Sequence, residues 1–266
     1  MKLLTLARDL QRRKARERHQ QFVAEGVRTV ESLLASPCPV DGVLVAEDAR
    51  DDVRVAALID LAEGRGIAVR TVTAREFESA ADTDAPQGVL AVAHMPEAAL
   101  TPPTGPSARY LVLDALQDPG NVGTVVRTAA ALGVTATIAL PGTVDVWNAK
   151  VVRSAMGALF THTVVATDWD RCQAFLAEQG APCWAADMDG QSIDALDRAA
   201  LPARLALVVS NEGAGLSPHI EAAVAARVAI PMAPGIESLN VAVATGILLQ
   251  ALRPVRLPAT GAVPVA

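Results

Sequence analysis

The apolar residues of this chain fall into short continuous runs, separated by longer stretches with helical spacing. In the second half of the chain, such runs lie at residues 110–114, 134–140, 163–166, 182–186, 205–209 and 228–230. Short runs without alternation are typical of strands buried on both faces, and helical stretches between them are typical of crossovers in a parallel sheet. The pattern therefore predicts an α/β domain with a parallel sheet over residues 109–253. Ligands of such sheets bind beyond the carboxyl ends of the strands.

A smaller set of elements precedes this domain. The first 95 residues combine a basic helical start with a helix near residues 51–63 and apolar strands near residues 42–46, 67–72 and 88–93. Residues 96–107 contain four prolines and a glycine, a composition typical of an interdomain linker. We therefore predict a small α/β domain over residues 1–95, a linker over 96–108 and, after the second domain, a flexible tail over 254–266.

Composition narrows the classes of function. Apolar residues make up 51% of the 266 residues, enough for a packed core, whereas aromatic residues make up only 3%, which speaks against a stacking surface for single-stranded nucleic acid. Three cysteines and four histidines are scattered without the spacing of a metal site or a disulfide framework, so no metal is expected. No apolar run reaches the roughly 18 residues that span a bilayer, and the N-terminus has no signal core, so we expect a soluble cytoplasmic protein.

The formal net charge of −6 conceals a basic N-terminal segment. Residues 1–30 hold eight Lys or Arg against three acidic residues, a net charge of +5, which leaves −11 for the rest of the chain. A solvated helix face would have the same composition, but a basic segment on an otherwise acidic protein favours contact with a polyanion. The candidate contacts are Arg12, Arg13, Lys14, Arg16 and Arg18.

A junction at residues 111–129 carries the first candidate site. The apolar run ends at Asp114, turns through Asp118-Pro119-Gly120, and continues as a helix that Asn121 is predicted to cap. A valine-rich stripe of this helix faces the core, whereas Arg127 lies roughly 140° from its centre at about 100° per residue. The small residues beside Arg127 leave room for an anion. The sequence here lacks the glycine pair of a dinucleotide-binding turn, a Walker lysine and a nucleophile elbow.

Two later strands also end in loops with special backbone chemistry. Glu212 stands just past the run at 205–209, and Ser217 followed by Pro218 is predicted to open the next helix. After the run at 228–230, a loop with two prolines and a glycine leads to Ser238, which is predicted to cap the last helix. Such loops expose N–H and C=O groups, so the two junctions together predict one ligand crevice.

The three stretches resemble motifs 1, 2 and 3 of the SpoU, or TrmH-type, ribose 2'-O-methyltransferases of the SPOUT superfamily. These motifs read D-P-x-N-x-G-x-x-x-R, N-E-G, and I-P-M followed by S-L-N. They are matched here by Asp118, Pro119, Asn121, Gly123 and Arg127, by Asn211, Glu212 and Gly213, and by Ile230, Pro231, Met232, Ser238, Leu239 and Asn240. The resemblance covers residues 109–252. The N-terminal part, including the segment 22–26, resembles the L30e-like RNA-binding domain that precedes many members.

This resemblance implies a catalytic SPOUT domain with a deep trefoil knot, an exception to the usual absence of knots. It also implies a homodimer and S-adenosylmethionine as cofactor, held in a bent form mainly by backbone contacts at positions matching Ser210, Ile230 and Leu239. The implied cofactor-binding residues are Val209, Ser210, Asn211, Gly213, Ile230, Pro231, Met232, Ser238 and Leu239. The implied catalytic residues are Asn121, Arg127, Glu212, Ser238 and Asn240.

The implied activity is methylation of a ribose 2'-hydroxyl in structured RNA. Ribosomal RNA, specifically 23S, is favoured over transfer RNA because the N-terminal part resembles that of ribosomal RNA enzymes. The basic segment of this part would clamp RNA phosphates. A guanidinium stays protonated, so Arg127 is expected to anchor phosphate and stabilise alkoxide charge, with Glu212 as its charge partner or as the proton acceptor.

Two departures from the family pattern keep an alternative of another class open, a non-catalytic RNA-binding or ribosome-assembly factor. Ser210 stands where a glycine is usual before N-E-G. The segment Arg153-Ser154-Ala155-Met156-Gly157 carries its serine one place earlier than the family's R-x-S-x-G. Because a helix turns about 100° per residue, Ser154 would not substitute directly for a hydroxyl at position 155.

Overall fold

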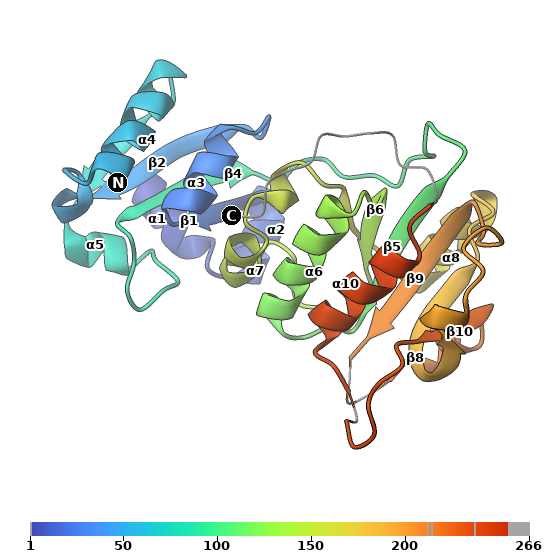
Figure 1. Ribbon diagram of the computed structural model, residues 1–266. Coiled ribbons are helices and arrows are strands. Elements are labelled where there is room, and N and C mark those ends of the chain that lie inside the picture. Colours follow the sequence, from blue (N-terminus) through green and yellow to red (C-terminus); the bar gives the residue numbers. More distant parts are fainter. Residues whose placement is uncertain (1, 212, 214, 237, 255–266) are drawn as a thin grey trace. The chain divides into compact units, whose positions relative to one another are not determined.

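The computed structural model describes residues 2–211, 213, 215–236 and 238–254 (Figure 1). Up to residue 94 its elements are α1 (Lys2–Asp9), α2 (Arg13–His19), β1 (Gln21–Glu25), α3 (Val27–Leu34), β2 (Val40–Ala46), η1 (Glu47–Ala49), α4 (Val53–Gly64), β3 (Val69–Val72), α5 (Ala74–Glu78) and β4 (Val89–His94). Then follow β5 (Ala108–Asp114), α6 (Pro119–Ala131), β6 (Ala136–Ala139), α7 (Ala149–Ser154), η2 (Ala158–Phe160), β7 (Val164–Ala166), α8 (Trp169–Glu178), β8 (Cys183–Ser192), η3 (Ile193–Ala195), β9 (Arg204–Ser210), α9 (Pro218–Glu221), β10 (Ala226–Ala229) and α10 (Val241–Ala251).

Contacts between residues divide the chain into two compact units with interleaved bounds. The first unit comprises Met1–Ala99, Leu116–Arg127 and Thr143–Val164, and the second comprises Leu100–Ala115, Thr128–Gly142 and Val165–Ala266. Residues 95–107 contain neither helix nor strand. The predicted domain and linker boundaries stay predictions, and most of the predicted tail, residues 255–266, lies outside the described residues.

A four-stranded mixed sheet forms the centre of the first unit. Its order is β1-β4-β2-β3, in which β4 is antiparallel to both β1 and β2, and β2 is parallel to β3. Helices α3 and α4 pack against each other and against strands of this sheet. A core of leucine side chains with Phe77 from α5 includes Leu4, Leu10, Leu44 and Leu90.

The strand β1 was not among the predicted elements. Only three apolar residues lie between Gln21 and Glu25, so the apolar run is too short to stand out. Gln21 and Glu25 are nevertheless buried. Their hydrogen-bonding partners offset the cost of burying these polar side chains. Glu25 accepts from the backbone amide of Asp82 at 2.6 Å and from the hydroxyl of Thr83, which ties β1 to the loop before β4.

A six-stranded sheet forms the centre of the second unit, in the order β10-β8-β9-β5-β6-β7 (Figure 1). The pairings of β5 with β6 and β9, and of β8 with β9 and β10, are parallel. The predicted α/β fold with a parallel C-terminal sheet is therefore confirmed. Its core includes Tyr110, Val112, Ile138, Leu176 and Val208.

Strand β8 is longer than the predicted run at 182–186. Residues 187–192 interrupt the apolar pattern, and the register with β10 shifts there. Arg227 lies opposite Ala185, whereas the next residue, Val228, lies opposite Gln191. Within the described residues, no helix is both long and apolar enough to cross a membrane. The same residues contain no group of three or more His, Cys, Asp or Glu arranged to hold a metal ion. The trefoil knot stays a prediction.

Candidate active site

A cavity of about 630 Å³ opens in the second unit where β9 and β10 end. Residues of β8, α9 and α10 also contribute to its wall. Seven of the nine predicted cofactor-binding residues line it, namely Val209, Ser210, Asn211, Ile230, Met232, Ser238 and Leu239. Gly213 and Pro231, although described, do not line it. The structure thus brings together the two loops that the sequence pattern expects to share one crevice.

The loop after β9 is held by a buried carboxylate that sequence reasoning missed. Asp114, the last residue of β5, is only 2% exposed, and its two oxygens accept the amide and the hydroxyl of Ser217, each at 2.7 Å. The carbonyl of Asp114 also accepts the amide of Asn211 at 3.3 Å. An acidic residue directly after the apolar run at residues 110–113 is the sequence signal that could have identified this position.

The described residues of this loop fold back on themselves. Asn211 accepts the amide of Gly213 through its side-chain oxygen at 2.9 Å, and it forms an isolated bridge with Gly215. Ser217 precedes α9 with Pro218 at the first helical position, as predicted. However, the hydroxyl of Ser217 donates to Asp114, and the side chain of Ser217 does not cap the helix. Glu212, a predicted catalytic residue, lies outside the described residues.

Asn240, not Ser238, caps the last helix. The side-chain oxygen of Asn240 accepts the amides of Ala242 at 2.9 Å and Val243 at 3.4 Å, and α10 begins at Val241. The prediction of a cap at Ser238 is therefore wrong. Ser238 instead lies in the loop and contributes to the cavity wall.

Charged side chains of both signs also line the cavity. Arg227 of β10 pairs with Asp187 of β8 and, at 2.9 Å, with Glu221 of α9. A hydrogen bond from the amide of Asp189, together with the Arg227 guanidinium, holds the pKa of Asp187 below its ordinary value. The sequence offers no signal for this cluster, because its three members lie on different elements.

The helix that carries the first motif belongs largely to the first unit. Asp118, and not Asn121 as predicted, caps α6: its side chain accepts the amide of Asn121 at 2.7 Å, and the helix begins at Pro119. The predicted core stripe is confirmed for Val122, Val125, Val126 and Ala129, which are fully buried, whereas Gly133, also predicted to belong to it, follows the helix and is exposed. Arg127 is exposed, as its place on the opposite face predicts.

Helix α7 packs closely against the start of α6. A Cβ atom on Gly123 would lie 2.7 Å from the carbonyl oxygen of Val151 and would overlap the hydroxyl of Ser154. That hydroxyl donates to the carbonyl of Lys150 at 2.7 Å, whereas Ala155 is fully buried. The serine shifted by one place thus serves the contact between α7 and α6 and does not occupy the environment of position 155.

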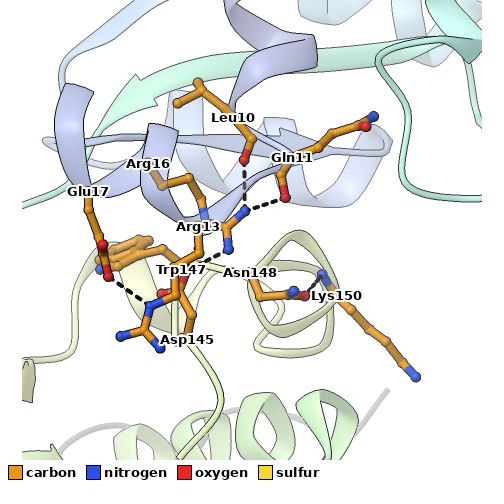
Figure 2. Close-up of polar contacts among 9 residues, drawn as sticks. All are labelled: Leu10, Gln11, Arg13, Arg16, Glu17, Asp145, Trp147, Asn148 and Lys150. Atoms are coloured by element: carbon orange, nitrogen blue, oxygen red, sulfur yellow. Dashed lines mark hydrogen bonds and ion pairs between the residues drawn. The ribbon is translucent and has the colours of Figure 1, made fainter.

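The basic segment divides into exposed residues and one buried residue. Arg12, Arg13, Lys14 and Arg18 are exposed, whereas Arg16 is only 4% exposed and pairs with Asp145 (Figure 2). A buried guanidinium that is already paired cannot reach an RNA phosphate. The expectation of an RNA contact at Arg16 is therefore withdrawn, and it is kept for the other four.

Comparisons with known proteins agree with these motifs. A family model described as the SpoU rRNA methylase family matches residues 108–250, more than half of the chain, and a model of the MRM3-like substrate-binding domain matches residues 5–91. The 23S rRNA (guanosine(2553)-2'-O)-methyltransferase RlmP of Bacillus subtilis is 33% identical over 245 residues, which cover 92% of this chain and 93% of the relative. The 23S rRNA (guanosine-2'-O-)-methyltransferase RlmB of Xanthomonas campestris is 32% identical over 237 residues, which cover 86% and 94%.

A solved structure gives the same picture. The AdoMet-bound rRNA methyltransferase from Sinorhizobium meliloti has a TM-score of 0.80 and 26% sequence identity to this chain, with 96% of this chain and 95% of the other covered. The family expected from the three motifs is confirmed by the family model and by the identity to RlmP over nearly the whole length. This chain belongs to the SpoU rRNA methylase family.

Proposed function

We propose that this protein methylates the 2'-hydroxyl of a ribose in 23S ribosomal RNA, with S-adenosylmethionine as the methyl donor. The observation that carries the proposal is the cavity lined by residues of the N-E-G and I-P-M/S-L-N motifs in a chain of the SpoU family. Relatives that are 33% and 32% identical are named 23S rRNA 2'-O-methyltransferases, which supports ribosomal over transfer RNA.

The cavity suits this cofactor in size and chemistry. Its volume of about 630 Å³ falls within the roughly 300–1,000 Å³ of small-molecule sites. Apolar side chains such as Val209, Ile230 and Leu239 offer a surface for a flat base, while Asp187 and Arg227 offer both charge signs to an amino-acid group. Bound there, S-adenosylmethionine would supply an electrophilic methyl group on its sulfonium.

The residues of the chain itself would align the acceptor and manage charge. We assign Arg127 to anchoring an RNA phosphate and stabilising the developing alkoxide, because a guanidinium offers several N–H donors and no acceptor. Asn121, on the same helix, would help to orient the ribose. Glu212 either pairs with Arg127 or accepts the proton. Ser238 would contribute to the cofactor site and Asn240, whose side-chain oxygen caps α10, would brace it.

The RNA phosphates would be clamped by Arg12, Arg13, Lys14 and Arg18. Such contacts give an affinity for RNA that depends on salt but little choice of sequence.

The active form would be a knotted homodimer in the cytoplasm. Exposed apolar side chains on α10 support a partner copy, because Val243 and Ile247 are 53% and 38% exposed. Measurement of the mass in solution by light scattering tests the dimer, and a monomeric mass would contradict it.

The decisive experiment is transfer of labelled methyl from S-adenosylmethionine to RNA that lacks native modifications, for wild type and Arg127→Ala. The proposal predicts labelled 2'-O-methylnucleoside in 23S RNA with the wild type, and loss of the label with intact cofactor binding in the variant. Label in transfer RNA only would reassign the substrate. Cofactor binding without transfer to any RNA would support the non-catalytic factor.

A further inference from the structure

Arg16 and Asp145 form an ion pair between distant segments of the first unit. The side chains of both are largely buried, at 5% and 16% exposure. Arg16 donates twice to one oxygen of Asp145, from Nε at 2.8 Å and from Nη2 at 2.6 Å. Its Nη1 donates to the carbonyls of Leu10 and Gln11, both at 2.8 Å (Figure 2). These contacts fix the guanidinium in one orientation.

Asp145 uses its remaining acceptors to shape its own loop. Its second carboxylate oxygen accepts the amide of Trp147 at 3.0 Å, and its carbonyl accepts the amide of Asn148 at 2.9 Å. Asn148 in turn caps α7, because its side chain accepts the amide of Lys150 at 2.9 Å (Figure 2). The ion pair therefore fixes the point at which α7 begins.

The position of α7 is passed on to the helix that carries Arg127. Ser154, at the end of α7, packs against Gly123 of α6, where a Cβ atom has no room, and its hydroxyl lies 3.2 Å from the carbonyl of Pro119. Arg127 lies one helical turn beyond Gly123. A second tie supports the same arrangement, since Arg153 of α7 pairs with Asp82 at 3.2 Å.

We propose that Arg16 and Asp145 are a positioning pair for methyl transfer, which sets α7 and, through it, the placement of Arg127. This inference rests on the proposed function. Burial of an ion pair is an inefficient way to gain stability, but in some proteins it selects one arrangement of the segments it joins. In-line displacement depends steeply on alignment, so a small shift of α6 lowers the rate of the chemical step more than it lowers the affinity for RNA.

The first test compares Asp145→Asn with Glu17→Gln. Glu17 pairs with Arg13 on the same helix as Arg16, but its side chain is 57% exposed, so the control removes the same charge from an exposed pair. In Asp145→Asn we expect kcat to fall about tenfold to a hundredfold, because a misplacement of about 1 Å can lower the rate of a chemical step about a hundredfold. The KM for RNA and the Kd for S-adenosylmethionine should stay near the wild-type values. In Glu17→Gln, which frees Arg13 of the RNA clamp, the control readouts are kcat and the Kd for S-adenosylmethionine, and both should match the wild type.

The second test separates positioning from loss of folding. Replacing both partners, in Arg16→Met/Asp145→Leu, removes the two charges together, so the melting temperature should fall less than in Asp145→Asn, which leaves the charge of Arg16 buried and unpaired. We expect kcat to remain low in this variant, and hydrogen exchange over residues 143–154 to rise in both Asp145→Asn and the double variant.

An unchanged kcat in a folded variant would overturn the inference, because Arg16 would then serve stability alone. A rise in KM alone would also overturn it, because Arg16 would then act as an RNA contact. A wild-type protein that transfers no methyl group would instead overturn the proposed function. That result would be seen before any variant is compared.

Discussion

Ser217 donates its amide to one oxygen of Asp114 and its hydroxyl to the other, so a buried carboxylate at the end of β5 closes the loop that follows β9. Within the second unit, Asp114 and Ser217 do not line the cavity themselves, but they hold the loop whose residue Asn211 lines it. The loop between Asn211 and Ser217 is held at both ends by the same aspartate, through its carbonyl and its carboxylate.

We therefore expect Asp114→Asn to weaken binding of S-adenosylmethionine about tenfold or more, because hydrogen bonds to a charged group contribute about 1.5–3 kcal/mol each and an amide turns a donor toward one of the two partners. Isothermal titration calorimetry measures the effect. Asp168→Asn, which changes an exposed cap on α8, is the matched control. Equal affinities in the two variants would show that the loop needs no anchor.

Replacement of Arg127 by lysine should lower kcat/KM about a hundredfold, because lysine keeps the charge but loses the planar fork that grips phosphate with two donors. Binding of S-adenosylmethionine should not change. Single-turnover assays on RNA measure the effect, and Arg171→Lys, at an exposed arginine of α8, serves as control. Wild-type activity in Arg127→Lys would rule out two-point recognition by this residue.

Gly123→Ala should destabilise the protein by about 1–3 kcal/mol, because the added methyl group has no room between α6 and α7. Thermal unfolding measures the loss. Gly64→Ala is the control, because a Cβ atom there meets no other atom within 4 Å. Adding Ser154→Ala should restore stability only in part, since the carbonyl of Val151 still stands 2.7 Å from the new carbon. Full recovery in the double variant would contradict this account.

His162 should make the protein less stable as the pH falls from 6.5 toward 4. Burial lowers the pKa of His162 from 6.5 to about 4, so in this window the unfolded chain takes up a proton that the folded chain does not. Unfolding is then favoured by up to about 1.4 kcal/mol for each pH unit. Urea unfolding of His162→Leu should show a shallower pH dependence than the wild type. His19→Gln, at an exposed histidine, should match the wild type.

The exposed basic residues of the N-terminal segment should govern the salt dependence of RNA binding. Substitution of Arg12, Lys14 and Arg18 by alanine should reduce the slope of log K against log salt by about one for each RNA phosphate that is no longer neutralised. Filter binding at several salt concentrations gives this slope. A control variant removes the same charge at the exposed residues Arg54, Arg70 and Arg75. Equal slopes in the two variants would indicate that the net charge of the protein, and not the N-terminal segment, determines the salt dependence of RNA binding.

The sequence predicts those features that depend on continuous patterns. Strands β5 and β9 are recognisable because each contains a continuous run of apolar, buried residues, and the placement of Arg127 follows from the helical period. Cap positions are less predictable, because suitable residues occur close together. Asp118 and Asn121 precede or open α6, and Ser238 and Asn240 precede α10. The residue type alone does not tell which of them adopts the capping conformation.

Partners that lie far apart in sequence leave no such signal. The charge of Arg16 resembles that of its exposed neighbours, and only the fold places Asp145 beside it. Asp114 is similar, because its partner Ser217 belongs to a different strand-to-helix connection. In each case the energetic need to pair a buried charge is clear, but the choice of partner is made by topology.

The aromatic contacts of β1 bear on how the chain is made. Phe22 is fully buried, and its ring lies 4.6 Å from that of Trp147 and 5.7 Å from that of Phe160, both centroid to centroid. On the ribosome, the first strand therefore emerges long before the rings that cover it are synthesised. Until then an apolar surface stays open, as in other proteins whose folding awaits later segments. A fragment that ends at residue 95 would carry this uncovered surface permanently. The first unit therefore completes its folding only when residues 143–164 are present.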